Sequence, residues 1–216
     1  MTQEVFEIIE RLVIEAFNSR NAAKDYASKC KRQCVVEPGF PILWFGDLDT
    51  YLKTEPKKRA ISVGVNPSGK ELHQNSKGLY VHFPGFKNKR PTPDVNEYVE
   101  AMNMYFSVAP LNWFNKGMEE VPYSYEKGTL IHIDCCSTIA TRPTWTGLCP
   151  SMQGFLKQNN KSLFEELLII LSPSKIYIAS NKKEYDYIKS VCMSNLGLDD
   201  SSIEPIDKYG NQRIML

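Results

Sequence analysis

Three short apolar runs, far apart in the chain, constrain its fold more than any other feature. They are "RAISVGV" (residues 59–65), "TLIHIDCC" (129–136) and "KIYIAS" (175–180). Runs rich in Ile and Val are typical of strands buried on both faces of a parallel sheet. Helix-like stretches separate them, and strands that alternate with helices indicate a sheet covered on both sides. The sequence therefore predicts a three-layer α/β/α fold with a central, mainly parallel sheet of four to five strands.

The remaining elements follow from periodicity and capping residues. Apolar residues at helical spacing predict a helix over 3–17, within a helical N-terminal extension of residues 1–40. Asp47, Asp94 and Ser162 each precede a helical pattern and are predicted N-caps, and Gly197 is a predicted helix end. Two further strands are predicted at 41–45 and 212–216. No repeat or linker divides the 216 residues, so we expect one domain spanning 1–216.

Composition and charge bear on the compartment and the partners of the protein. The net charge of +1 does not indicate a nucleic-acid binder by itself, although positive charge can gather on one face. The first residues carry acids and lack the pattern of a signal peptide, and no run is apolar enough to span a membrane. We therefore expect a cytoplasmic protein with no membrane partner. Its six cysteines are then reduced thiols, and most of them are expected in the core.

The stretch "ISVGVNPSGKEL" (61–72) leads from the first strand into a long irregular segment. Gly64 to Lys70 matches the start of a phosphate-binding loop, G-x-x-x-x-G-K, which would make the chain an NTPase. The next residue in that motif is a magnesium-binding hydroxyl, but here it is Glu71. Pro67 also lacks an amide that such a loop uses. The NTPase interpretation is therefore an alternative and not the leading one.

The same stretch, read as "VGVNPS", resembles the first motif of the uracil-DNA glycosylase superfamily. The resemblance covers roughly residues 59–216 in the order of elements, and "GVNPS" is its sharp match. It implies a DNA glycosylase-like enzyme that hydrolyses the base–sugar bond of a flipped-out nucleotide. Asn66 would position the attacking water. The other pocket residues implied are Gly64, Val65, Pro67 and Ser68, with Tyr80 as first and Phe83 as second choice for stacking on the base.

Asp134 stands where the family has an asparagine that reads the base edge. An amide both donates and accepts hydrogen bonds, whereas an ionised carboxylate only accepts. Asp134 therefore suits a base edge that offers N–H donors. Because a carboxylate repels carbonyl oxygens, uracil is a poor match for this pocket, and a non-uracil base is the expectation. The family's later His-Pro-Ser type turn does not occur before Leu216. This leaves a non-catalytic nucleic-acid or nucleotide binder of the same fold as the main alternative.

The resemblance also implies contacts outside the base pocket. Asn181 follows the third strand and is expected near the ligand. DNA is the expected partner, and the residues expected near its backbone are Lys87, Lys89, Arg90 and Arg142. Trp145 either faces DNA or anchors its loop, and Lys182 and Lys183 either meet phosphates or are solvated.

No metal or cofactor is expected. One branch of the superfamily holds an iron–sulfur cluster, and Cys30, Cys34, Cys136 and Cys149 follow a similar order. The Cys-x-x-x-Cys spacing of the first pair differs from Cys-x-x-Cys, so buried thiols are the better expectation. His132 lies within the second strand and is expected to be a core histidine.

Overall fold

A four-stranded, all-parallel sheet forms the centre of the protein. The computed structural model describes residues 1–29, 34, 39–67, 69, 83, 93–108 and 121–205. The strands are β1 (Ala60–Gly64), β2 (Leu130–Asp134), β3 (Lys175–Ile178) and β4 (Ile203–Pro205), in the order β2-β1-β3-β4. This arrangement confirms the predicted α/β class and its parallel sheet.

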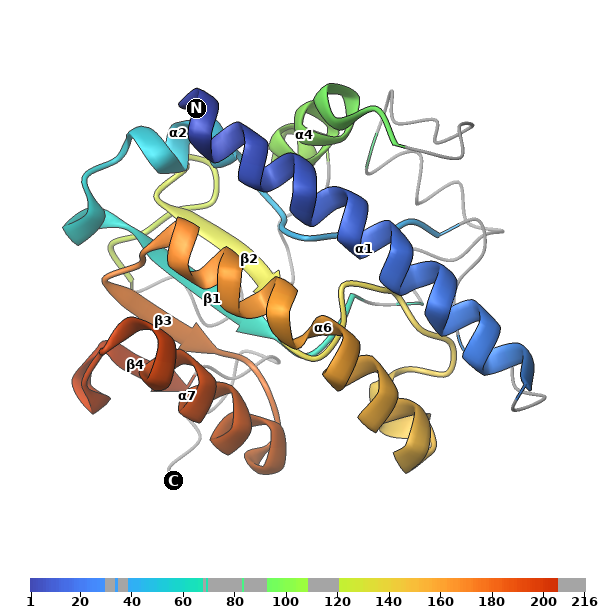
Figure 1. Ribbon diagram of the computed structural model, residues 1–216. Helices are drawn as coiled ribbons and strands as arrows, with labels where there is room; N and C mark the ends of the chain where they lie inside the picture. Colours follow the sequence, from blue (N-terminus) through green and yellow to red (C-terminus); the bar gives the residue numbers. More distant parts are fainter. Residues whose placement is uncertain are drawn as a thin grey trace.

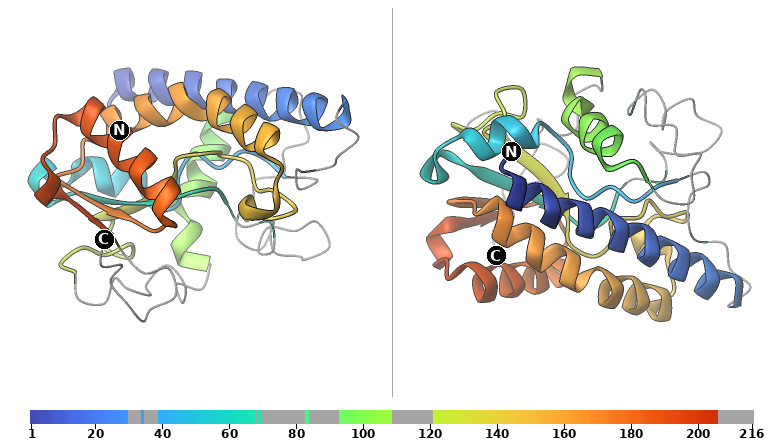
Figure 2. Two further views of the ribbon diagram at one scale, coloured as in Figure 1. Left: turned by 90° about the horizontal axis from the view of Figure 1, so that it is seen from below. Right: turned by 45° about the horizontal axis from the view of Figure 1, so that its top comes forward.

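Helices cover the sheet and complete a three-layer α/β/α architecture (Figure 1). Their bounds are α1 (Gln3–Lys29), α2 (Leu48–Lys53), α4 (Val95–Asn103), α5 (Tyr105–Val108), α6 (Pro150–Leu171) and α7 (Lys182–Leu196). Figure 2 shows α1, α6 and α7 on one side of the sheet, with α5 on the other. Three short 3-10 turns lie at Pro56–Lys58, Trp145–Gly147 and Asp200–Ser202.

The two faces of the sheet differ in chemistry because side chains alternate along each strand. One face is aliphatic and packs against the long helices; it carries Ile61, Val63, Ile131, Ile133, Ile176 and Ile178. The other face carries Ser62, Gly64, His132, Asp134 and Tyr177, under a cover of aromatic rings. Buried polar side chains are thus confined to one face of the sheet.

The topology identifies the carboxyl end of β1 as the expected position of a ligand site. The chain leaves β1 for its neighbour β2 and later crosses back to β3 on the other side of β1. Ligands of open parallel sheets bind beyond the carboxyl ends of the strands at such a reversal. The loops after β1, β2 and β3 all begin at this edge.

Three of the four predicted helix-end signals are confirmed. The Asp47 carboxylate accepts a hydrogen bond from the Thr50 amide, and Asp94 caps α4 in the same way. Gly197 ends α7 with a φ of 63°, a conformation that favours glycine. Among the described residues, no helix combines the length and the apolar character that crossing a bilayer would require.

Several predicted elements were wrong. Helix α1 continues to Lys29 because Ala23 and Ala27 extend its buried face. Ser162 is no N-cap: α6 begins at Pro150, and the Ser162 hydroxyl donates to Glu15 on α1. Residues 41–45 form no strand beyond one antiparallel bridge between Phe45 and His132.

Two other expectations concern the ends of the chain. The N-terminal helix is no mere extension, because Leu12 and Val13 are buried in the same apolar cluster as the strands. Strand β4 was not predicted, whereas the predicted strand at 212–216 lies outside the described residues.

Candidate active site

The carboxyl ends of β1 and β2 bring the main predicted residues together. Gly64 lies directly opposite Asp134 in the parallel register. The pairing continues past the strands, since the Cys135 amide donates to the Gly64 carbonyl at 3.1 Å and the Cys136 amide to the Val65 carbonyl at 2.9 Å. The candidate site therefore lies on two strand ends whose relative position is fixed by backbone hydrogen bonds.

Gly64 allows the Asp134 side chain to lie against the backbone of β1. A Cβ atom at Gly64 would lie 2.4 Å from Asp134 Oδ1 and 3.0 Å from His132 Nε2. Real Cβ atoms essentially never lie within 3.0 Å of another atom, so the contact with Asp134 would be a clash, and both neighbouring side chains are buried. The absence of a side chain at Gly64 is thus a requirement of this arrangement.

Asp134 is a buried carboxylate without a hydrogen-bond donor among the described residues. Its side chain is 3% exposed, and the nearest basic side chain in that part of the chain is His132, with 3.6 Å between Oδ1 and Nε2. That distance exceeds a hydrogen bond. Burying a charged group costs free energy, so a buried carboxylate at the edge of a sheet is a candidate for a role toward a ligand or in catalysis.

Behind Asp134 lies a chain of buried polar side chains that the sequence interpretation did not identify. His132 Nδ1 lies 2.7 Å from Ser62 Oγ, and Ser62 Oγ lies 2.6 Å from the Tyr125 hydroxyl. All three residues are at most 4% exposed. His132 is thus the predicted core histidine with a hydrogen-bond partner, but it also faces Asp134. The signal was the His-x-Asp spacing, which places both side chains on one face of a strand.

Asn66 lies two residues beyond Gly64 with its amide group fixed. Its Nδ2 donates to the Thr141 hydroxyl at 2.9 Å and to the Pro67 carbonyl at 3.1 Å. A carbonyl can only accept, so this contact identifies the NH2 side of the Asn66 amide. Asn66 Oδ1 then points away from both partners as an acceptor, which is the group needed to orient a water molecule.

Hydrogen bonds from the Asn160 side chain of α6 hold the loop after β2 in place. This side chain is 2% exposed; its Nδ2 donates to the carbonyls of Asp134 and Cys135, and its Oδ1 accepts from the Thr138 amide. Three hydrogen bonds to one loop hold the backbone on which the Asp134 side chain is mounted.

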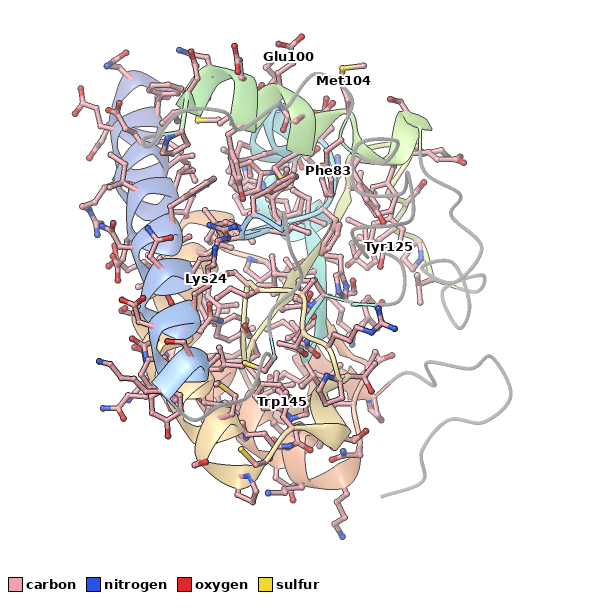
Figure 3. The ribbon with its side chains drawn as sticks, turned by 90° about the vertical axis from the view of Figure 1, so that its right-hand side faces the viewer. Lys24, Phe83, Glu100, Met104, Tyr125 and Trp145 are labelled. Atoms are coloured by element: carbon pink, nitrogen blue, oxygen red, sulfur yellow. The ribbon has the colours of Figure 1, made fainter. Side chains whose placement is uncertain are left out.

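The end of β3 contributes structural contacts and exposed cations. Asn181 is the N-cap of α7 and accepts from the Glu184 amide at 3.2 Å, so its side chain has a helix-capping role. Trp145 is buried, and its Nε1 donates to Glu184 at 3.4 Å, so it anchors its loop against α7. Figure 3 looks from the side toward which the strand arrows of Figure 1 point, and Trp145 lies within this view.

The rim around that anchor is basic. Arg142, three residues before Trp145, is exposed, as are Lys182 and Lys183 in the first turn of α7. The contact between Trp145 and Glu184 joins the two segments that carry these side chains. Positive charge is therefore grouped beside the carboxyl ends of the strands.

The remaining predicted residues divide into two groups. Phe83 is fully buried and packs edge-on against Phe40, with ring centroids 5.2 Å apart, so the structure gives it a core role. In Figure 3 it lies beneath α4, on the same side of the sheet as Tyr125. Outside the described residues lie Ser68, Tyr80, Lys87, Lys89 and Arg90, together with Lys70 of the alternative phosphate-binding motif.

The cysteines of the described chain are core residues. Cys34 and Cys136 are buried in one small apolar cluster, and Cys149 packs against it. Burial raises the pKa of the Cys135 thiol well above its usual range, and the adjacent Cys136 thiol adds to the shift. Within the described residues, no group of three or more His, Cys, Asp or Glu side chains is placed to hold a metal ion. Cys30 lies outside them.

Comparisons with protein-family models, with curated proteins and with solved structures find no match to this chain. The glycosylase resemblance carried by "GVNPS" therefore stays a prediction. The functional assignment rests on the geometry of Gly64, Asn66, His132 and Asp134.

Proposed function

We propose that the protein is a DNA glycosylase-like hydrolase, which cleaves the N-glycosidic bond of a base flipped out of DNA. The observation that carries the proposal is the buried Asp134 carboxylate, which lacks a hydrogen-bond donor among the described residues at the carboxyl edge of the sheet. A base edge with an N–H group would supply that donor. Binding of such a ligand would then offset the desolvation cost of the carboxylate.

Asn66 has the geometry to orient the attacking water. Hydrolysis of a base–sugar bond requires a water molecule aimed at the sugar carbon while the base departs with the bonding electrons. Asn66 Oδ1 can accept a hydrogen bond from that water, since its amide nitrogen is held by Thr141 and Pro67. An amide cannot take up a proton, so Asn66 only orients the water. The departing base leaves with the bonding electrons and can accept the proton that the water loses.

DNA is the partner that the exposed charges favour. Arg142, Lys182 and Lys183 form a basic rim beside the strand ends, where phosphates would flank an extruded nucleotide. Extruding the base itself costs a few kcal/mol, which phosphate contacts and stacking would have to offset.

A single-turnover assay tests the proposal. The full chain in molar excess is incubated with duplexes containing uracil, hypoxanthine, xanthine or an alkylated base, and abasic sites are detected by strand cleavage. We expect release from at least one substrate, and a decrease of about 100-fold or more in Asn66→Ala and Asp134→Asn. Asn195→Ala is a matched control, because in the described part of the chain the Asn195 side chain bonds the Val191 carbonyl within α7.

The same geometry also suits a binder without catalysis, because Asn66 is a weak catalytic group. Duplex binding that depends on Arg142 and Asp134, with no abasic sites from any substrate, would favour that function over hydrolysis. Absence of both binding and base release would reject both proposals.

A further inference from the structure

We propose that His132 is a positioning residue for Asp134, held as the Nε2–H tautomer by a buried relay that runs from Tyr125 through Ser62. The role of His132 toward a ligand rests on the proposed function, whereas the choice of its tautomer does not. The relay joins the segment before β2, the middle of β1 and the middle of β2.

The first step concerns the source of the relay. Burial raises the pKa of the Tyr125 hydroxyl, and the hydrogen bond with Ser62 offsets only part of that shift. Tyr125 is therefore a neutral phenol that can donate its proton to Ser62 Oγ. The Tyr125 ring is fixed by Phe106, with centroids 4.5 Å apart, so its hydroxyl has a defined direction.

The second step concerns the direction of the hydrogen bonds. When Ser62 Oγ accepts from Tyr125, its own proton is free to go to His132 Nδ1, 2.7 Å away. A neutral imidazole that accepts at Nδ1 carries its proton at Nε2. The opposite tautomer would direct the Nε2 lone pair at the Asp134 carboxylate 3.6 Å away, which is unfavourable. The two ends of the ring thus select the same tautomer.

The third step concerns what the tautomer does to Asp134. The Nε2–H dipole and the Gly64 backbone both face Oδ1 of the carboxylate. They orient the side chain so that Oδ2 remains as the oxygen through which Asp134 meets a ligand. The relay therefore specifies a ligand group that donates a hydrogen bond, such as a ring or exocyclic N–H of a base. A base edge made only of acceptors is excluded.

Nitrogen-15 NMR of protein labelled at histidine measures the tautomer directly. The chain has three histidines, and His132→Asn assigns the signals of the third. We expect His132 to show a protonated Nε2 and an unprotonated Nδ1. Ser62→Ala removes the donor to Nδ1 and should let both tautomers populate, while Tyr125→Phe should cause a smaller change in the same direction.

Tyr98→Phe is the matched control. Tyr98 is another buried tyrosine, but its hydroxyl bonds the backbone of Pro41 and Leu43. This variant should leave the His132 signals unchanged. Protonation at Nδ1 in the wild-type protein, or an unchanged tautomer in Ser62→Ala, would overturn the proposal. If Ser62→Ala does not fold, the wild-type and Tyr125→Phe spectra still decide it.

This experiment contains no substrate, so its outcome is separate from that of the base-release assay. A protonated Nε2 together with no base release would reject the hydrolase and keep the relay. Base release together with a protonated Nδ1 would do the reverse.

Discussion

Replacing Asp134 by asparagine should stabilise the fold while lowering the proposed base release. Asparagine has the same shape as aspartate but carries no charge. The Asp134 carboxylate is 3% exposed, and within the described residues it faces only His132 at 3.6 Å. A buried polar group without a partner costs about 1–3 kcal/mol, and a charged group costs more. Because the amide keeps part of that penalty, we expect a net gain of roughly 1–2 kcal/mol.

Urea denaturation at neutral pH measures this change as an increase in the free energy of unfolding. For a chain of this size, each kcal/mol corresponds to about 2–4 °C in Tm, so thermal unfolding should shift upward by roughly 2–8 °C. Asp47→Asn is the matched control. Asp47 caps α2, and asparagine caps a helix equally well, so its stability should change by less than about 0.5 kcal/mol.

The sign of the Asp134→Asn effect is the informative result. Destabilisation by more than about 1 kcal/mol would mean that the carboxylate is a structural acceptor that the fold needs. The reasoning behind a ligand-facing Asp134 would then be wrong. Stabilisation together with retained base release would mean that Asp134 takes no part in the reaction. Asn66 would then be the remaining candidate for a catalytic residue.

Three other predictions concern packing, loop bracing and pH. Gly64→Ala should lower stability by about 1–3 kcal/mol in urea, because its Cβ would overlap Asp134 Oδ1; an unchanged midpoint would refute the close packing of the two strand ends. Asn160→Ala should cost about 3 kcal/mol and speed amide hydrogen exchange in the loop after β2, and unchanged exchange there would contradict the bracing role. The hydrogen bond from Arg11 lowers the pKa of Glu166 below its ordinary value, so its contribution is present at neutral pH and is lost as the pH falls through the folded pKa. Both side chains are substantially exposed, so Glu166→Gln should remove less than about 1 kcal/mol, and only above that pH; a loss that persists in acid would contradict the ion pair.

Three of the four strands and three of the helix-end signals could be predicted from the sequence because these signals are local. The apolar runs around Ile61, Ile131 and Ile176 needed burial on both faces, and only the interior of a sheet offers that. Asp47 and Gly197 act on backbone groups a few residues away, so their roles do not depend on the rest of the fold.

The start of α6 could not be predicted from local signals in the same way. Ser162 and Glu165 matched a capping box, but the helix begins twelve residues earlier at Pro150, a residue favoured in the first turn. The intervening turns contain Gly154 and the pair Asn159 and Asn160, which are weak helix formers. They are helical because Leu156 and Asn160 are buried, one in the small apolar cluster and one against the loop after β2. Tertiary packing decided this boundary.

Only part of the candidate site could be predicted, because some of its residues are placed by tertiary folding and not by a local pattern. The rule that ligands bind at the carboxyl ends of strands sufficed to bring Gly64 and Asp134 together. It did not identify Tyr125, which lies in an irregular segment, or its bond to Ser62, which depends on how that segment folds back over the sheet. A side chain that reaches the site from a turn leaves no periodic signal in the sequence.

The register between β1 and β2 makes the candidate site inseparable from the fold. Ser62 pairs with His132, and Gly64 pairs with Asp134, so the relay and the close approach to Asp134 depend on one alignment. A slip of one residue would exchange these polar side chains for the neighbouring isoleucines and valine. The aliphatic face against α6 and α7 forbids that slip, because it would bury the polar set among apolar helices. The core that stabilises the sheet is therefore also what places the Asp134 carboxylate beside His132.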